Sequence, residues 1–551
     1  MPLTDDEVRF LCDRNEELKG IRRLYEPLWE EIAEYVFPRR VGIGSEPTVG
    51  AKQTTKMYDS TAPNSHAELS AIMHDSLTPD DFIWSTFKLR DDRLNKIKEV
   101  KDWIEAVAST MSVVRSQSNF SAEMDEVYLD FVAFGTACLF IEEKPIYFPG
   151  FNGLRYKAIP NNEYCVSEDA DGRVDTLFRE FELSARAAVK KFGKEVGEKI
   201  IKEAENKPET RFKFLHATIP LDMEFNRVGK KNWNFYYIHL GEKDLLRDGG
   251  YYEFPYIVPR WSKSSGEDYG RGPTHIALPD VKTLNKAKEF GLKAWAKDLD
   301  PPTFEKDNGV IGSLKLWPGG RNIARDKESI WTMEHHIRYD ASQLKQEELQ
   351  LSIQRAYYID QIMNQIRKGP EMTATEVQVR YELMQRILGP TLGRFNGEAL
   401  NPCIEREFGL MMRASSGRFP VLPPPPQILA QMGVTDIDIE YEGPLAKAQR
   451  RGEMKSMQNV AQVAIGMIQG GFNPEILDNF DGDKVIQHAS DVEGIPSKVM
   501  RSTEQVAAIR EKRAKLQAIE QQKQDLERLA AGAKDAAPMV GVLGGQGENT
   551  A

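Results

Sequence analysis

The chain has 551 residues, which favours several packed subdomains, because a single core stops growing near about 250–300 residues. Its composition, 40% hydrophobic and 28% charged, is that of a soluble globular protein, and its apolar runs are shorter than the roughly 20 residues that a membrane span needs. Its formal net charge of −11 argues against a generic DNA-binding protein, whose binding domain is normally basic.

The first thirty-odd residues are predicted to form one amphipathic helix that ends at Pro38. Thr4 and Glu7 have the spacing of a capping box at its start. Apolar residues then recur at intervals of three and four: Leu18, Ile21, Tyr25, Leu28 and Ile32. Residues 39–60 are polar and glycine-rich, which indicates a loop or a flexible arm.

Two further helices are predicted over about 60–77 and 95–115. The second carries apolar residues on one face: Val100, Trp103, Ile104 and Val107. Residues 120–134 lead into a mixed region where short strands alternate with turns up to residue 260, interrupted by a helix at about 184–206. Asp169–Gly172 has part of a calcium-loop pattern, but Ser167 and Phe178 occupy ligand positions, so a tight turn between strands is the better interpretation.

Residues 274–299 are predicted to form a helix with two distinct faces. An apolar face carries Val281, Leu284, Gly291, Trp295 and Leu299. Four lysines lie on another face, within an arc of about 60°: Lys282, Lys286, Lys293 and Lys297. This lysine stripe is either a solvated surface or a basic surface offered to DNA phosphates.

Residues 300–339 contain Pro301-Pro302 and Pro318-Gly319-Gly320, which interrupt the helical pattern with a compact, turn-rich insert. The pattern resumes over about 340–366. Its polar residues span an arc of about 100°: Gln343, Gln346, Gln350, Gln354, Gln361 and Gln365, with Glu347. This glutamine stripe is either a solvent face or a neutral surface that DNA can touch without being held.

Arg367-Lys368-Gly369-Pro370 is a helix stop, and the turn that follows continues to residue 375. A long helix over 376–419 is then predicted, bent where Pro390 and Pro402 remove hydrogen bonds. Its apolar stripe consists of Val377, Tyr381, Met384, Leu388, Leu392, Phe395 and Ala399. Pro420–Pro426 indicates a stiff spacer, followed by helices at about 445–470, 473–480, 482–490 and 497–530 and a disordered tail over 531–551.

The sequence contains no recognisable catalytic pattern. It has no phosphate-binding loop ending in Gly-Lys-Ser/Thr and no His-Glu-x-x-His zinc motif. The four cysteines are widely spaced, so buried free thiols are favoured over a zinc or redox site: Cys12, Cys138, Cys165 and Cys403. We therefore expect no enzyme activity, no cofactor and no metal.

Six short motifs occur in order along about four hundred residues of this chain. They are Trp29 with Tyr35-Val36-Phe37-Pro38-Arg39; Asp59-Ser60-Thr61 with Ala67, Leu69, Leu77-Thr78-Pro79, Phe82 and Trp84; Phe134-Gly135-Thr136-Ala137-Cys138-Leu139; Ile159-Pro160 with Tyr164; Pro259-Arg260-Trp261 with Gly266–Pro273; and Thr373-Ala374-Thr375-Glu376-Val377 with Arg380. In this order they resemble the portal (head-to-tail connecting) proteins of short-tailed, podovirus-type bacteriophages.

The resemblance implies an α+β, predominantly α subunit that assembles into a ring, generally dodecameric, at one vertex of the capsid. DNA enters the head through this ring during packaging and leaves through it on ejection. The implied parts are a wing (1–273), a first stem helix (274–299), a clip (300–339), a second stem helix (340–366), a tunnel loop (367–375), a long wing helix (376–419), a helical crown (420–530) and the tail. Either stripe then faces the channel, with Arg367 and Lys368 at its constriction.

The implied partners are other copies of the chain, the major capsid and scaffolding proteins, the large terminase subunit, a tail adaptor protein, and double-stranded DNA in transit without sequence specificity. No membrane is involved, and the implied location is the portal vertex of the virion, with the host cytoplasm during assembly. The alternative is a scaffolding or adaptor protein of the head–tail junction that forms no channel. End-on images separate the two, because only a portal gives rings with a central hole.

Overall fold

The computed structural model describes residues 4–43, 56–79, 83–89, 97–144, 151–221, 231–299, 339–363, 387–415, 420–431 and 505–524, with shorter pieces at 54, 92–95 and 439–442 and within 301–332 and 459–486. The chain divides into two compact units. The first comprises Met1–Arg90, Ala106–Pro424 and Asp436–Gln449, and the second comprises Asp91–Glu105, Pro425–Thr435 and Arg450–Ala551. Helices and sheets are both present and helices predominate, as the α+β prediction requires. None of the helices described here is long and apolar enough to cross a membrane.

The N-terminal segment forms two helices, so the prediction of a single helix is wrong. α1 covers Asp5–Arg22 and α2 covers Glu26–Tyr35. The predicted capping box is confirmed: the Thr4 hydroxyl accepts from the Glu7 backbone N–H, and the Glu7 carboxylate accepts from the Thr4 N–H. The break falls just before Pro27, which has no N–H to donate to the preceding turn. A short 3-10 turn, η1 (Pro38–Arg40), follows α2.

The larger sheet has five antiparallel strands in the order β4-β5-β6-β7-β8. Their bounds are Tyr164–Glu168 (β4), Val174–Ser184 (β5), Arg211–Pro220 (β6), Trp233–His239 (β7) and Asp244–Tyr251 (β8). Successive side chains along each strand point to opposite faces of the sheet. Leu215 packs with Leu11 of α1, whereas its neighbour Phe214 packs with Ala188 on the other face.

That second face is covered by α7 (Ala185–Phe192), η2 (Gly193–Val196) and α8 (Gly197–Asn206). One continuous helix was predicted here, and the prediction is wrong. Gly193 and Gly197 have φ of +67° and +81°, a backbone conformation that ends a right-handed helix. The Ser184 hydroxyl accepts from the Ala187 N–H at the start of α7.

A second core joins the N-terminal helices to a smaller sheet. It includes α2, α6 (Phe120–Phe134) and the antiparallel strands β3 (Leu154–Ala158), β2 (Leu139–Glu143) and β9 (Tyr256–Ile257). Trp29 is fully buried at its centre, with its ring 5.1 Å from that of Tyr269 and 6.4 Å from that of Phe134. All four cysteines are buried free thiols, as predicted.

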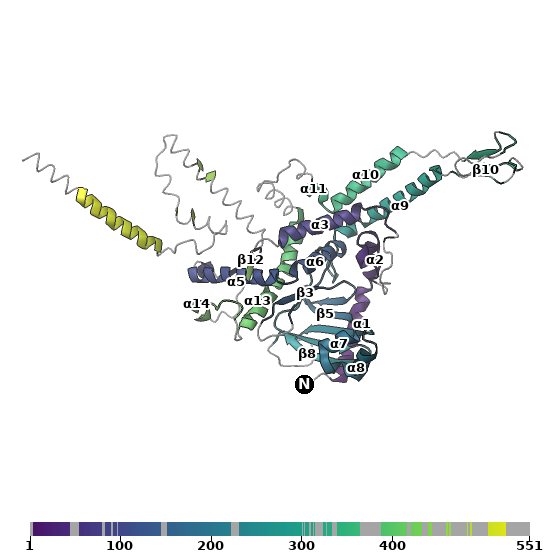
Figure 1. Ribbon diagram of the computed structural model, residues 1–551. Coiled ribbons are helices and arrows are strands. Elements are labelled where there is room, and N and C mark those ends of the chain that lie inside the picture. Colours follow the sequence, from purple (N-terminus) through teal and green to yellow (C-terminus); the bar gives the residue numbers. More distant parts are fainter. Residues whose placement is uncertain are drawn as a thin grey trace, which may run out of the picture. The chain divides into compact units, whose positions relative to one another are not determined.

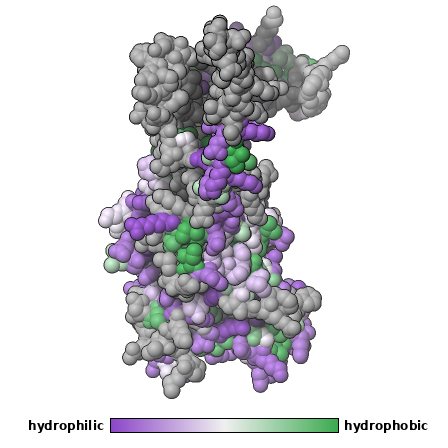
Figure 2. Space-filling model, turned by 90° about the vertical axis from the view of Figure 1, so that its left-hand side faces the viewer, coloured by the Kyte–Doolittle hydropathy of each residue, from purple (hydrophilic) through white to green (hydrophobic). Residues whose placement is uncertain are grey.

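The remaining elements include the predicted helix at 60–77, confirmed as α3 (Thr61–Leu77). The others are α4 (Asp92–Asn95), α5 (Lys98–Ser116), α13 (Asn401–Ser415), α14 (Gln427–Gln431), the antiparallel pair β1 (Thr86–Leu89) and β12 (Ile439–Glu442), and a helical run at 505–524. The predicted apolar face of α5 is buried. On the face drawn in Figure 2, hydrophilic residues cover most of the described surface, with small hydrophobic groups between them.

Candidate functional site

The predicted lysine-bearing helix is present as α9 (Pro273–Leu299), whose 27 residues give a length of about 40 Å. α10 (Tyr339–Ala356) runs beside α9 in the opposite direction (Figure 1). The antiparallel strands β10 (Thr303–Glu305) and β11 (Ile330–Thr332) lie beyond the C-terminal end of α9. We call α9 and α10 the helix pair, and its end near α3 the base. At the base, the Tyr357 hydroxyl donates to Thr274 Oγ1 over 2.9 Å.

The predicted helix over 340–366 is interrupted at the base, which corrects that prediction. α10 ends at Ala356 and a short helix, α11 (Ile359–Met363), follows. Tyr358 between them has a φ of +60°, which is unusual for a residue other than glycine. The turn places the fully buried Tyr357 ring against α9, so tertiary packing overrides the local helical pattern here.

Burial along the apolar face of α9 changes from one end to the other. Val281 and Leu284, near the base, are 1% and 0% exposed. Trp295 and Leu299 lie on the same face but are 55% and 67% exposed, and Leu344 of α10 is 67% exposed. The end of the helix pair that is farther from the base therefore presents apolar side chains to solvent in a single chain.

The lysine stripe is interleaved with carboxylates. Lys282 pairs with Glu31 over 3.1 Å, and both Lys286 and Lys293 pair with Glu289, over 3.0 and 2.6 Å. Hydrogen bonds from Lys293 and Lys286 lower the pKa of Glu289, and the same contact raises the pKa of Lys293. The Lys297 side chain is exposed near the end of the helix.

The glutamine stripe is divided between solvent and internal contacts. Gln343 and Gln361 are exposed, and Gln354 is half-buried. Gln350 Nε2 donates to the Asp59 carboxylate over 3.2 Å, and Gln346 lies beside Gly291 of α9. Part of this stripe therefore holds α10 in place within the subunit.

Asp59 anchors the middle of the helix pair, and its role there was not predicted. Its buried carboxylate pairs with Lys288 of α9 and also accepts from the Thr61 backbone N–H at 2.8 Å. Burial raises the pKa of Asp59, but the hydrogen bonds from Lys288 and Thr61 outweigh it and lower that pKa overall. Asn285 Oδ1 also accepts the backbone N–H groups of Tyr58 and Asp59, at 2.6 and 3.0 Å. Residues 58–59 are therefore bound to both helices of the pair.

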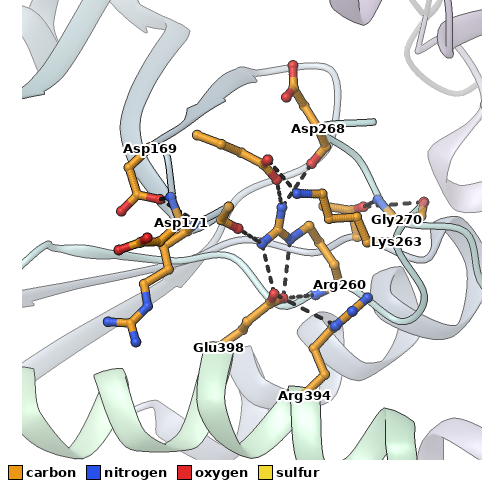
Figure 3. A network of polar contacts seen from close by, with 12 residues as sticks. Asp169, Asp171, Arg260, Lys263, Asp268, Gly270, Arg394 and Glu398 are labelled. Carbon is orange, nitrogen blue, oxygen red and sulfur yellow. Dashed lines mark hydrogen bonds and ion pairs between the residues drawn. The ribbon is translucent and has the colours of Figure 1, made fainter. Parts of the chain in front are cut away.

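A second polar cluster surrounds Arg260, in the loop that precedes α9 (Figure 3). Its side chain is 1% exposed and pairs with Glu168 of β4 and with Glu398, which lies 2.8 Å away. The Arg260 backbone N–H donates to the same Glu398 carboxylate over 2.9 Å. Burial opposes the charge of the guanidinium, but Glu398 and Glu168 more than offset it and raise its pKa.

The β4–β5 turn completes this cluster. Asp169 Oδ1 accepts from the backbone N–H groups of Asp171 and Arg173, at 2.9 and 2.8 Å, which confirms the predicted tight turn. Gly172 has a φ of +78°, and its carbonyl accepts from Arg260 over 2.9 Å. Lys263 pairs with Glu168. Arg260 therefore joins a strand, a turn and a distant helix.

Two of the sequence motifs contact each other directly. Gly135, which ends α6 with a φ of +72°, lies against Gly272, and a Cβ built on Gly135 would be 2.2 Å from the Gly272 nitrogen. The Thr136 hydroxyl accepts from the Gly270 N–H over 2.7 Å. Glycine is required at Gly135 because both the conformation and the space exclude a side chain.

Several predicted site residues lie outside the described part of the chain, namely Gln365, Arg367 and Lys368 together with the whole of 367–375. Of the predicted buried stripe on the long helix, Leu388, Leu392, Phe395 and Ala399 are described and buried. Among the described residues, no group of three or more His, Cys, Asp or Glu side chains is arranged to hold a metal ion.

Comparison with known proteins places the chain among phage proteins. The family model for the bacteriophage head to tail connecting protein matches residues 11–500. A relative named "Probable portal protein", from Bordetella phage BPP-1, is 30% identical over 94% of this chain and 93% of its own length. The "Portal protein" of Salmonella phage epsilon15 is 27% identical over 93% of this chain and 92% of its own length. The chain therefore belongs to the bacteriophage head to tail connecting protein family.

Proposed function

We propose that this protein forms a ring of about twelve copies at one vertex of the phage capsid, through which DNA enters during packaging and leaves on ejection. Family membership over nearly the whole chain supports this proposal. The single structural observation that carries it is the uncovered apolar face of the helix pair, where Trp295 and Leu299 are more than half exposed in one chain. Burying such a face is favourable, at about 25 cal/mol per Å² of apolar surface, so neighbouring subunits would gain by packing there.

The channel wall would be built from the helix pair, with either the lysine stripe or the glutamine stripe toward the DNA. The carboxylates of Glu31 and Glu289 beside the lysines support a weak, transient contact, because paired lysines hold phosphates less strongly than free ones. Arg367 and Lys368 would supply positive charge at the constriction. Neutralising both should leave rings intact but impair the retention or passage of DNA, measured as packaged genome per particle.

The partners would meet the ring at its two ends and around its rim. The insert at 300–339 would contact the large terminase subunit during packaging and the tail adaptor afterwards, whereas the major capsid and scaffolding proteins would hold the ring at the portal vertex. Deleting residues 305–325 should leave rings that no longer bind terminase or adaptor in a pull-down. Normal recruitment of the adaptor would assign that role to another part of the chain.

Native mass measurement and negative-stain images of the purified full-length chain test the channel itself. A species near twelve subunits with end-on rings and a central hole is expected. A monomer that persists at high concentration, or oligomers without a hole, would favour the alternative of a scaffolding or adaptor protein at the head–tail junction.

A further inference from the structure

Residues 387–415 form one continuous helical run with a π-helical segment, Asn396–Leu400, in its middle. The Asn401 N–H donates to the Asn396 carbonyl, five residues earlier, instead of to the carbonyl four residues earlier. Pro402 explains why the π segment lies here. In a regular α-helix the Pro402 ring would collide with the Glu398 carbonyl, and Pro402 has no N–H to donate. Such segments are rare within helices and recur at functional sites.

The helical residues on either side of the π segment are anchored independently. Before it, Phe395 is fully buried and stacks on Tyr128 of α6 at 5.4 Å between ring centroids. After it, the buried Glu407 carboxylate of α13 accepts from Arg115 and from the Tyr156 hydroxyl, both over 2.6 Å. The π segment therefore connects two fixed helices.

The first half of the π segment has few packing contacts, whereas Ala399 and Leu400 in its second half are buried. A Cβ built on Gly397 would meet no described atom within 4 Å, so packing does not require glycine at this position. Glycine in a helix costs about 1 kcal/mol relative to alanine. Within the described residues, the side-chain oxygens of Asn396 and Asn401 are buried with no hydrogen-bond partner, which is a further cost at each end of the segment.

Besides the burial of Ala399 and Leu400, one ion pair offsets these costs. Glu398, in the middle of the π segment, accepts from both the guanidinium and the backbone N–H of Arg260, at 2.8 and 2.9 Å (Figure 3). Arg394, one turn earlier, lies 4.0 Å from the same carboxylate. Because Arg260 is also bound to Glu168 and Gly172, Glu398 ties the π segment to a rigid part of the larger sheet.

We propose that the π segment Asn396–Leu400 is a hinge between residues 387–395 and α13, and that the Arg260–Glu398 ion pair keeps it closed. Prolines and π segments are two of the recognised causes of kinks in helices, and hinges are short stretches that absorb the change in backbone angles. Opening requires that Glu398 leave Arg260, which keeps Glu168 as its partner, and that the packing of Ala399 and Leu400 adjust. This inference concerns the folded chain alone and does not depend on the proposed function.

Hydrogen–deuterium exchange on the full-length protein tests the hinge, with Glu398→Gln as the opening variant. We expect exchange in the peptide covering 394–401 to accelerate at least about tenfold, while peptides from α6 and β6 keep their rates. Glu163→Gln is the matched control, because Glu163 pairs with the buried Arg179 over 2.8 Å and is 30% exposed, against 24% for Glu398. The control should leave the 394–401 peptide unchanged.

Gly397→Ala is the closing variant. The added methyl group fits the open space and favours helix, so exchange over 394–401 should slow severalfold and partly restore the rate in the Glu398→Gln background. Two results would overturn the proposal. One is an unchanged 394–401 peptide in Glu398→Gln. The other is uniform acceleration across the whole first unit, which would make the ion pair a general fold contact.

Discussion

Two kinds of ion pair occur in the first unit, and they differ in what surrounds them. Arg260 and Arg115 are 1% and 5% exposed, and each is held by a carboxylate and by further hydrogen bonds from separate parts of the chain. Three lysines of the lysine stripe, Lys282, Lys286 and Lys293, pair with Glu31 or Glu289 while remaining 42–63% exposed. Losing one partner of a buried pair leaves an uncompensated charge, whereas an exposed pair exchanges its partner for water. The buried arginines therefore fix the fold, and the lysines stay available for contact with something else.

The strongest way to test this contrast is to break the buried pair. Arg115→Ala leaves the Glu407 carboxylate, which is 0% exposed, without its cation. We expect a loss of about 3–5 kcal/mol in the free energy of unfolding, measured as a lower urea midpoint of the full-length protein. A loss below about 1 kcal/mol would mean that the buried and exposed pairs are equivalent.

The second test concerns the close backbone contact between Gly135 and Gly272. Gly135→Ala places a methyl group against the Gly272 backbone at a φ of +72°, so we expect a loss of about 2–4 kcal/mol. Gly266→Ala is the control: its φ is +85° in a hydrogen-bonded turn, but no described atom lies within 4 Å of the new Cβ, so about 1–2 kcal/mol is expected. Urea midpoints compare the two variants, and equal losses would contradict the close contact.

A third test uses pH. Burial lowers the pKa of His66 from 6.5 to about 4, although its ring nitrogen contacts the Leu129 carbonyl at 2.8 Å. Between pH 6.5 and pH 4 the unfolded chain binds more protons at His66 than the folded chain does. The free energy of unfolding is therefore unaffected by His66 above pH 6.5 and decreases as the pH falls from 6.5 to 4. His66→Gln should reduce the loss of stability between pH 7.5 and pH 5 by about 1–2 kcal/mol. Parallel pH curves for the variant and the native chain would argue against a buried, neutral His66.

The smallest effect is expected in the lysine stripe. Lys282→Gln removes an exposed pair with Glu31, so the free energy of unfolding should change by less than about 1 kcal/mol. A chain that carries Gln at Lys282, Lys286, Lys293 and Lys297 together should assemble into the proposed ring as the native chain does, which size-exclusion chromatography can check. A large loss of stability would place these lysines with the buried arginines.

Local sequence patterns predicted the elements whose boundaries depend on local chemistry. The capping box at Thr4, the helix at 60–77 and the turn at Asp169 are present because their hydrogen bonds lie within a few residues. The helix breaks at residues 23–25 and at Tyr358 were missed. Pro27 was a usable signal for the first break, but the second depends on the packing of Tyr357 against a helix that lies far away in sequence.

The polar clusters could be predicted only in part. Arg260 and Asp59 both lie in motifs that stood out in the sequence. Their partners did not, because Glu398 is 138 residues from Arg260 and Lys288 is more than two hundred residues from Asp59. Periodicity within a helix gives the face on which a residue lies and says nothing of what that face contacts. For the same reason helical periodicity groups the glutamines on one surface, although Gln350 belongs to the anchor at Asp59.

The anchor at Asp59 gives the helix pair the mechanics of a lever. Residues 58–59 are bound to Asn285 and Lys288 of α9 and to Gln350 of α10, and α9 extends about 16 Å beyond Lys288 to its end at Leu299. A tilt of about 12° at this anchor would move the end of such a rod by about 3.4 Å, roughly the spacing of one base pair along DNA. A modest rotation at Asp59 would thus reach, at the far end of the pair, the scale of a single step along a duplex.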